Sequence, residues 1–244
     1  MSGLDNLGNT CYMNSVVQLL RYIKPVVQNM EQVVPKDEGL KHFVDLLYQG
    51  SSPQNFAACL KDFGFDPIYQ HDAHEFLLTM LDKLYESIEL ENPFEGKMIT
   101  TLTCANGHTS CRTDPFVCLS INGGIEDGIP SMMEPEIVEC KCEKCDEKVM
   151  TKMLDIEPND VVCVHYKRFN VDRKLRYKVP ILEDWNGYRL VGSCNHTGGL
   201  HGGHYTATVR TDSGWMHMND DYVKKIDGLP TESKVPYIMV YVRQ

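Results

Sequence analysis

The sequence predicts an α+β protein whose sheets are antiparallel. Helical periodicity dominates the first part of the 244-residue chain, to about residue 92, whereas short alternating and β-branched runs dominate from about residue 97. The expected strands follow one another and do not alternate with helices, so parallel βαβ units are not favoured. No internal repeat or long linker divides the chain, and we expect a single domain over residues 1–244.

Three apolar segments in the first part predict helices. The clearest spans residues 70–88, ends before Pro93 and Gly96, and has its apolar stripe at Ala73, Leu77, Met80, Leu81, Leu84 and Ile88. A shorter helix is expected over 40–48, before a Gly-Ser-Ser-Pro break at 50–53. The first helix begins near Cys11, where Thr10 or Asn9 could provide the N-cap.

The second part of the chain predicts short strands separated by Gly, Asp, Asn and Pro clusters. The expected strands are residues 99–103, 116–121, 137–140, 161–169, 188–194, 204–210, 215–218 and 237–243.

Composition limits the function classes. A formal net charge of −10 disfavours nucleic acid as the main partner and favours a partner with a basic face or tail. The sequence contains neither an apolar run of about 20 residues nor a secretory signal at its start, so we expect no membrane partner and a cytoplasmic or nuclear protein. Ten cysteines in such a chain point to reduced thiols that bind metal or act in catalysis.

Cys11 follows a turn-rich stretch and starts an apolar helical segment. At a helix N-terminus the peptide dipoles lower a thiol pKa, and the thiolate is the nucleophilic form. Two upstream asparagines, Asn6 and Asn9, could donate hydrogen bonds to a developing oxyanion. On this pattern alone a small buried hydrophobic residue is an equally good interpretation.

A cysteine nucleophile needs a base, and the base needs an orienting group. His204 follows two glycines at the start of an alternating run, and is our first candidate for the base; His196 is a distant second. Asn219 and Asp220, one hairpin further on, could accept a hydrogen bond from the imidazole. Turn formation is the simpler explanation of these two residues when they are taken alone.

Asp72 and Glu75 lie three positions apart at the start of the 70–88 helix. Spacing alone favours a capping box, although the same pair could bind a basic group of a ligand.

Several motifs together resemble the ubiquitin-specific proteases, a family of papain-like cysteine deubiquitinases. They are the Gly-Leu-Asp-Asn-Leu-Gly-Asn-Thr-Cys-Tyr-Met-Asn run at 3–14, Gln-His-Asp-Ala-His-Glu-Phe at 70–76, Val-Cys-Val-His-Tyr-Lys-Arg-Phe at 162–169, Gly-Gly-His-Tyr-Thr-Ala at 202–207 with the run from 215 to 223, and Pro-Tyr-Ile-Met-Val-Tyr at 236–241. The motifs occur in the family order and cover nearly the whole chain.

The resemblance implies a helical thumb over 1–95, mostly fingers over 96–160 and mostly palm over 161–244. It implies hydrolysis of the bond after the C-terminal glycine of ubiquitin, with ubiquitinated proteins and an adaptor protein as partners. Implied catalytic residues are Cys11 (nucleophile), His204 (base), Asn219 (third member), Asp220 (assisting) and Asn6 (oxyanion donor); implied substrate-binding residues are Asp72, Glu75, Gln70 and Tyr205. A protease for another ubiquitin-like modifier, or an inactive ubiquitin-binding module, are the alternatives.

The resemblance implies no catalytic cofactor, but family members often carry a structural zinc between two Cys-x-x-Cys pairs in the fingers. Cys142 and Cys145 match one pair, whereas the other is reduced to Cys104. His108 or Cys111 could complete a tetrahedral site, and loss of zinc is the alternative.

Overall fold

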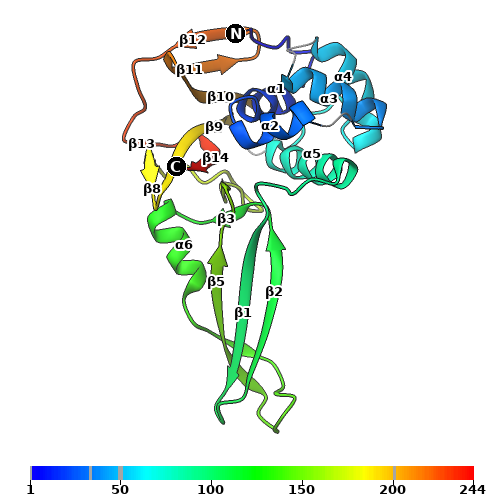
Figure 1. Cartoon of the computed structure of the whole chain (residues 1–244). Coiled ribbons are helices and arrows are strands. Elements are labelled where there is room, and N and C mark those ends of the chain that lie inside the picture. The colour runs from blue at the N-terminus through cyan, green and yellow to red at the C-terminus, as the bar shows by residue number, and fades with distance from the viewer. Residues whose placement is uncertain (1, 33–34, 49–51, 200–201) are drawn as a thin grey trace.

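The computed structural model describes residues 2–32, 35–48, 52–199 and 202–244, and shows helices on one side of a large sheet from which a long ribbon of strands extends (Figure 1). The first part of the chain supplies the helices α1 (Cys11–Leu20), α2 (Lys24–Gln32), α3 (Glu38–Tyr48), α4 (Pro53–Cys59) and α5 (Ala73–Ile88), with a short 3₁₀ helix at Leu60–Phe63.

Helix α5 begins three residues later than the pattern predicts. Asp72 has extended backbone angles and accepts hydrogen bonds from the backbone N–H groups of His74 and Glu75, so the carboxylate caps the helix. The predicted apolar stripe is confirmed, since its members are all buried.

The main sheet has the strand order β12-β11-β10-β9-β14-β6-β3, with β8 beside β9. Its strands are β3 (Leu119–Ile121), β6 (Val161–Tyr166), β8 (Asp184–Trp185), β9 (Tyr188–Gly198), β10 (Gly203–Thr211), β11 (Gly214–Asn219), β12 (Tyr222–Lys225) and β14 (Pro236–Arg243). All pairings are antiparallel except that of β3 with β6. Strands β7 (Val179–Pro180) and β13 (Glu232–Ser233) pair separately.

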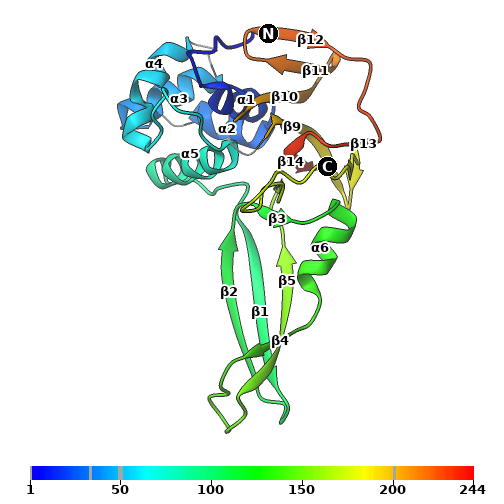
Figure 2. The ribbon, with the colours of Figure 1, turned by 180° about the vertical axis from the view of Figure 1, so that it is seen from behind.

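A second antiparallel sheet, in the order β2-β1-β5-β4, forms the ribbon that extends away from the helices in both views (Figures 1 and 2). Its strands are β1 (Gly96–Cys104), β2 (Thr109–Phe116), β4 (Glu136–Glu139) and β5 (Val149–Glu157). At its tip only Cys104, Cys142 and Met150 form a buried apolar cluster.

The sequence pattern missed several elements. Helix α6 (Ile125–Met133) lies in the part of the chain for which only strands were predicted, and Gly128 and Pro130 within it weaken the helical signal. The predicted strand 116–121 is wrong, because β2 ends at Phe116 and β3 starts at Leu119. Strands β2 and β5 were not predicted, since most of their side chains are exposed or half-exposed.

Helix α1 lies at the centre of the molecule, where all ten of its residues are buried. It packs against β10 and β9 of the main sheet and against α5 and α3 on the other side. Burial on all sides holds both ends of this helix in place, including Cys11 at its start. Within the described residues, no helix is long and apolar enough to cross a membrane.

Candidate active site

Cys11 is the first residue of α1, as the pattern predicts, and its side chain is 3% exposed. The predicted side-chain cap is wrong: the Thr10 hydroxyl makes no capping hydrogen bond and instead accepts one from the backbone N–H of Leu7 (2.9 Å). This bond closes the turn before the helix. Cys11 is therefore fixed by the turn and by burial of the helix.

The expectation that the helix start lowers the Cys11 pKa is not met. Burial raises the pKa of the Cys11 thiol, the backbone N–H of Tyr205 lowers it by less, and the Asp220 carboxylate raises it further. In the free protein the thiol therefore ionises less readily than an ordinary cysteine. A base must take its proton before the sulfur can act as a nucleophile.

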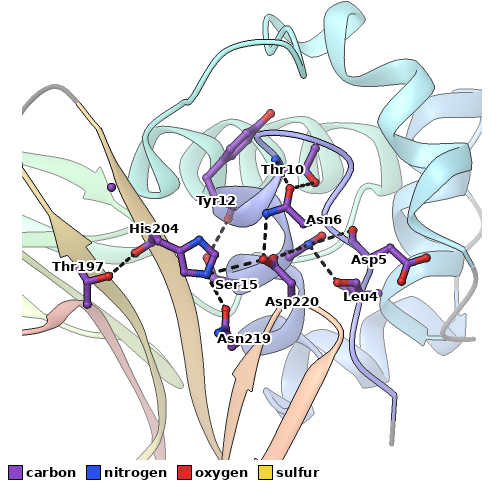
Figure 3. Close-up of polar contacts among 12 residues, drawn as sticks. Leu4, Asp5, Asn6, Thr10, Tyr12, Ser15, Thr197, His204, Asn219 and Asp220 are labelled. Carbon is purple, nitrogen blue, oxygen red and sulfur yellow. Dashed lines mark hydrogen bonds and ion pairs between the residues drawn. The ribbon is translucent and has the colours of Figure 1, made fainter.

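His204, the predicted base, lies at the start of β10, and its ring Nε2 is 2.5 Å from Oδ1 of Asn219. An amide oxygen only accepts, so Nε2 carries the proton and Nδ1 is left as the acceptor. Figure 3 shows the imidazole between Asn219 and the N-terminal end of α1. Among the described residues, His204 makes no hydrogen bond to Cys11 Sγ. Such a bond is often long or poorly aligned in a substrate-free active site.

Asp220 connects three parts of the chain around this histidine. Its carboxylate accepts hydrogen bonds from the side-chain amides of Asn6 (2.9 Å) and Asn14 (2.8 Å) and lies 3.7 Å from Nε2 of His204 (Figure 3). Its backbone oxygen accepts from the N–H of Leu4 (2.9 Å), and its φ is +52°. The turn between β11 and β12 thus holds the N-terminal segment against α1.

Asn14 was missed by the sequence analysis. It is 1% exposed, and its amide also lies 3.3 Å and 3.2 Å from the carbonyl oxygens of Leu4 and Asp5. An asparagine at a helical position that proves to be buried is the signal that could have identified it, since a buried amide needs partners.

The two upstream asparagines have different surroundings. Asn6 donates to Asp220 and its Oδ1 accepts from the Thr10 N–H (3.2 Å), which leaves one amide hydrogen free beside Cys11's helix. Asn9 donates to the carbonyl oxygen of Ile68 (2.5 Å). Each of the two side-chain amides has one hydrogen bonded within the described residues and a second available, so the expectation that both could face an oxyanion stays a prediction.

Gln70 holds the start of the strand that carries His204. Its side-chain amide donates to the carbonyl oxygen of Gly203 (2.9 Å) and accepts from the N–H of Gly203 (3.2 Å). This pair of bonds ties the loop before α5 to β10. A side chain at residue 203 would collide with the ring of His196, whose Nε2 would be 2.1 Å from the added Cβ.

His196, the second candidate base, lies in β9. Its Nδ1 accepts from Nζ of Lys174 (2.7 Å), and burial together with that ammonium lowers the pKa of His196 to about 4. With its ring nitrogen occupied, His196 supports the strand and does not serve as the base.

Asp72 joins the helices to the main sheet. Besides capping α5, its second oxygen accepts from the hydroxyl of Tyr237 in β14 (2.5 Å). Glu75 is exposed in the first turn of α5. Asp72, Gln70 and Tyr205 line one cleft of about 590 Å³, which also reaches Gly203, the neighbour of His204. The cleft therefore leads towards the catalytic candidates.

Two further histidines stack in the wall of this region. The rings of His74 and His165 are parallel within 10° with centroids 3.9 Å apart, and Ser120 lies 2.9 Å from Nδ1 of His165. Burial lowers the pKa of His165 to about 3 and also lowers that of His74, so both rings are neutral and can stack.

At the tip of the second sheet, Cys104, His108, Cys142 and Cys145 bring their ligand atoms within 4.8 Å of one another. Cys104 Sγ lies 3.6 Å from His108 Nδ1 and 3.8 Å from Cys145 Sγ, and Cys142 Sγ lies 3.8 Å from His108 Nδ1. Hydrogen bonds from the Asn106 side chain and the Glu147 backbone lower the pKa of Cys145 to about 6. The structure brings together the four residues predicted to bind metal, which could hold a structural ion.

The sequence model of the family described as ubiquitin carboxyl-terminal hydrolase matches residues 2–241. Ubiquitin carboxyl-terminal hydrolase 23 of Arabidopsis thaliana is 26% identical over 99% of this chain, which spans 35% of that protein. Ubiquitin carboxyl-terminal hydrolase 21 of Homo sapiens is 24% identical over 98% of the chain, which spans 61% of it.

Two solved structures share the fold over the whole chain. Ubp8 in the SAGA DUB module with Sgf11, Sus1 and Sgf73, bound to monoubiquitin, has a TM-score of 0.85 at 22% identity, with 69% of its own chain covered. The same module bound to ubiquitin aldehyde gives 0.82 at 20% identity and 70% coverage. These likenesses confirm the predicted α+β architecture of helical thumb, antiparallel palm and β fingers. Since the family model covers all but a few terminal residues, this chain belongs to the ubiquitin carboxyl-terminal hydrolase family.

Proposed function

We propose that the protein is a deubiquitinating cysteine protease that hydrolyses the (iso)peptide bond after the C-terminal glycine of ubiquitin. One observation carries the proposal: Nε2 of His204 is bonded to Asn219, which leaves Nδ1 as the free acceptor in a site that Cys11 shares. A buried thiol with a raised pKa needs that acceptor, and a ubiquitin-binding module without catalysis would not.

The reaction follows from these roles. Nδ1 of His204 takes the Cys11 proton, and the thiolate attacks the glycine carbonyl to form a tetrahedral oxyanion, which the Cys11 N–H and the free amide hydrogen of Asn6 stabilise. The imidazolium then protonates the leaving lysine amine and a thioester remains. A water then attacks the thioester while His204 takes one of its protons. The carbon–sulfur bond breaks, the imidazolium returns that proton to sulfur, and the released carboxylic acid gives its own proton to solvent. Asn219 and Asp220 position the ring throughout.

The cleft beside His204 is assigned to the ubiquitin tail. The exposed carboxylate of Glu75 and that of Asp72 offer negative charge to the arginines of that tail, while Gln70 and Tyr205 shape the path towards Cys11. Capping of α5 and tail binding are compatible, because a carboxylate has about four acceptor positions and the cap and Tyr237 together use three of them.

We assign a structural zinc to Cys104, His108, Cys142 and Cys145. With Zn–S near 2.3 Å and Zn–N near 2.0–2.1 Å, tetrahedral ligands are separated by roughly 3.8 Å (S to S) and 3.5 Å (S to N). The observed separations of 3.8 Å and of 3.6–3.8 Å fit this geometry. The ion would cross-link the tip of the fingers, and takes no part in hydrolysis. The division into thumb (1–95), fingers (96–160) and palm (161–244) remains our prediction.

The ten cysteines are all free, which suits a reducing compartment such as the cytoplasm or the nucleus. Because Ubp8 is seen with Sgf11, Sus1 and Sgf73, an adaptor protein is a further proposed partner. Nucleic acid and membrane are not proposed as partners.

A covalent trap tests the function directly. Ubiquitin carrying an electrophile in place of its C-terminal carboxylate should label the protein once, at Cys11, and mass spectrometry of the digested adduct locates the bond. Cys59→Ser, which changes a cysteine of α4, should label as the wild type does. If another ubiquitin-like probe labels Cys11 and the ubiquitin probe does not, the substrate is a conjugate of that other modifier. If no probe labels the protein, the proposed protease activity is refuted.

A further inference from the structure

A second cavity, larger than the cleft beside His204, lies where the helices meet the far ends of the central strands. Its volume is about 880 Å³, within the range of roughly 300–1,000 Å³ that is typical of ligand pockets. We call it the α2 pocket. Its lining comes from residues within the ranges 21–28, 189–191, 210–213 and 242–244.

The α2 pocket lies at the opposite end of the elements that carry the catalytic candidates. Cys11 and His204 stand at the starts of α1 and β10, whereas Arg21 follows the end of α1 and Arg210 lies near the end of β10. At about 1.5 Å per helical residue and about 3.3 Å per strand residue, roughly 15–20 Å separate the pocket from those two side chains. The described lining residues of the pocket and of the cleft do not overlap. A ligand in the pocket would therefore not meet the tail of the modifier.

Positive charge surrounds the α2 pocket, although the protein as a whole is acidic. Five of the 24 lysines and arginines of the chain line it, and Asp212 is the one acid among the described lining residues. The five cations are Arg21, Lys24, Arg189, Arg210 and Arg243. They come from segments far apart in the sequence, so the fold gathers this charge at one place.

Three of the arginines have carboxylate partners, none of which lines the pocket. The ion pairs are Arg189 with Asp184 (2.8 Å), Arg210 with Glu183 (3.3 Å) and Arg243 with Asp160 (3.2 Å). A guanidinium has five N–H donors, and one carboxylate accepts from two of them at most. Neither Arg21 nor Lys24 forms an ion pair within the described part of the chain. Donors therefore remain for a ligand that carries negative charge.

The floor of the α2 pocket is apolar. Val27 lies three positions after Lys24 on the same face of α2, and Val191 and Val242 lie on the paired strands β9 and β14. All three valines are half-buried, as is Tyr22 beside them. Apolar groups encircled by cations complement a ligand that has both apolar groups and carboxylates. A polyphosphate has no apolar surface with which to cover this floor.

We propose that the α2 pocket is a docking site for an acidic segment of a partner protein, in which carboxylates stand among apolar side chains. The carboxylates pair with Lys24 and the surrounding guanidinium groups, and the apolar side chains cover the valines. Since the net charge of −10 repels acidic proteins elsewhere on the surface, the local positive potential directs such a partner to this one place. This inference does not rest on the proposed function.

A display library of short peptides tests the chemistry of the occupant. Selection on the wild-type protein, with counter-selection on Lys24→Gln/Arg189→Gln, should enrich peptides that combine Asp or Glu with apolar residues. For a synthetic copy of the most enriched peptide, fluorescence anisotropy should give a Kd that rises with salt and that is roughly three- to tenfold higher in the double variant, as expected for two partly exposed ion pairs. Val27→Ser should weaken the same peptide by a similar factor, because part of the apolar contact is lost.

Lys36→Gln/Arg112→Gln is the matched control, because it also neutralises an exposed lysine and an exposed arginine that is paired with an aspartate, here Asp114. The control should bind the peptide as the wild type does. Equal binding by the two double variants would overturn the docking site, as would enrichment of neutral or basic peptides or of no peptide. Tighter binding of tripolyphosphate than of the selected peptide would also overturn it and show a polyphosphate site. Peptide binding is measured without ubiquitin, so failure of the proposed protease activity would leave this result unaffected.

Discussion

The catalytic region and the tip of the fingers are held together in different ways. The catalytic region surrounds α1, whose ten residues are all buried between the main sheet and the other helices. The tip of the fingers buries only Cys104, Cys142 and Met150. A large core orders polar side chains by packing alone, whereas three buried residues cannot order a loop, and a metal cross-link is the usual remedy. The comparison predicts that the two regions respond independently to perturbation.

The largest effect is expected at the nucleophile. Cys11→Ala should lower the hydrolysis of ubiquitin amides on the order of 10⁴-fold or more, because no other group can form the thioester. Since alanine fits the buried position, affinity for ubiquitin and melting temperature should stay near those of the wild type. Steady-state kinetics and calorimetric titration measure these quantities, and residual turnover above 1% of the wild-type rate would contradict the assignment.

Loss of the metal site should leave the catalytic region unchanged. Cys145→Ser should lose the single equivalent of zinc and the amide protection of residues 104–108 and 140–148, as a structural site contributes its binding energy to folding. A fluorogenic peptide made of the last residues of ubiquitin should still be cleaved by this variant. Cys111→Ser, an exposed cysteine of β2 outside the cluster, is the matched control. Elemental analysis and hydrogen exchange measure these two effects. If the wild-type protein contains no bound zinc, the proposed metal cross-link at the tip of the fingers is refuted.

Within the catalytic region, Asp220→Asn should lower kcat roughly 10²-fold, comparable to the loss of one oxyanion-hole donor. The amide that replaces the carboxylate cannot accept equally well from Asn6 and Asn14, so the N-terminal segment and the ring of His204 lose their common support. Asp221→Asn, the exposed neighbour, should be neutral. Equal kcat values for the two variants would show that the network has no catalytic role.

At the junction of thumb and palm, Asp72→Ala should raise KM for ubiquitin substrates roughly tenfold through loss of charge to the tail, and should also destabilise the protein by about 1 kcal/mol through loss of the α5 cap. Asp72→Asn retains the cap in part and separates the two contributions. A fall in stability with unchanged kinetics would leave Asp72 as a helix cap only.

The last prediction concerns the pH dependence of stability and does not involve catalysis. Burial holds the pKa of His165 at about 3 and that of His196 at about 4, so these rings stay neutral in the folded state while histidines of the unfolded chain take up protons below pH of about 6.5. The unfolded state then binds more protons, and stability falls as pH drops from about 6.5 towards those values, by at most about 1.4 kcal/mol per pH unit for each histidine. Melting temperatures between about pH 6.5 and pH 5 measure this slope. His165→Gln should flatten it, and an unchanged slope would contradict the buried neutral ring.

Local pattern was sufficient for much of the fold, whereas the residues of the site were predicted only from several family motifs taken together. The apolar stripe of α5, the helix start at Cys11 and most palm strands follow from periodicities that reflect burial of one face. Helix α6 and strands β2 and β5 did not follow, because a helix containing glycine and proline and a sheet exposed on both faces lack that periodicity. The fingers form because β5 pairs with β1, a strand far away in the sequence. A pattern read over a few neighbouring residues cannot reveal such a pairing.

The sequence by itself determined which residues we predict to carry the chemistry: one thiol at a helix start, one histidine at a strand start, an asparagine and an aspartate after the next strand, and a Cys/His set in the fingers. Only the tertiary structure decided their states. It raised the pKa of Cys11 by burial, left Nδ1 of His204 free by bonding Nε2 to Asn219, and joined Asn6 and Asn14 through Asp220. Desolvation and charge act through space, so they depend on neighbours that the order of residues along the chain does not reveal.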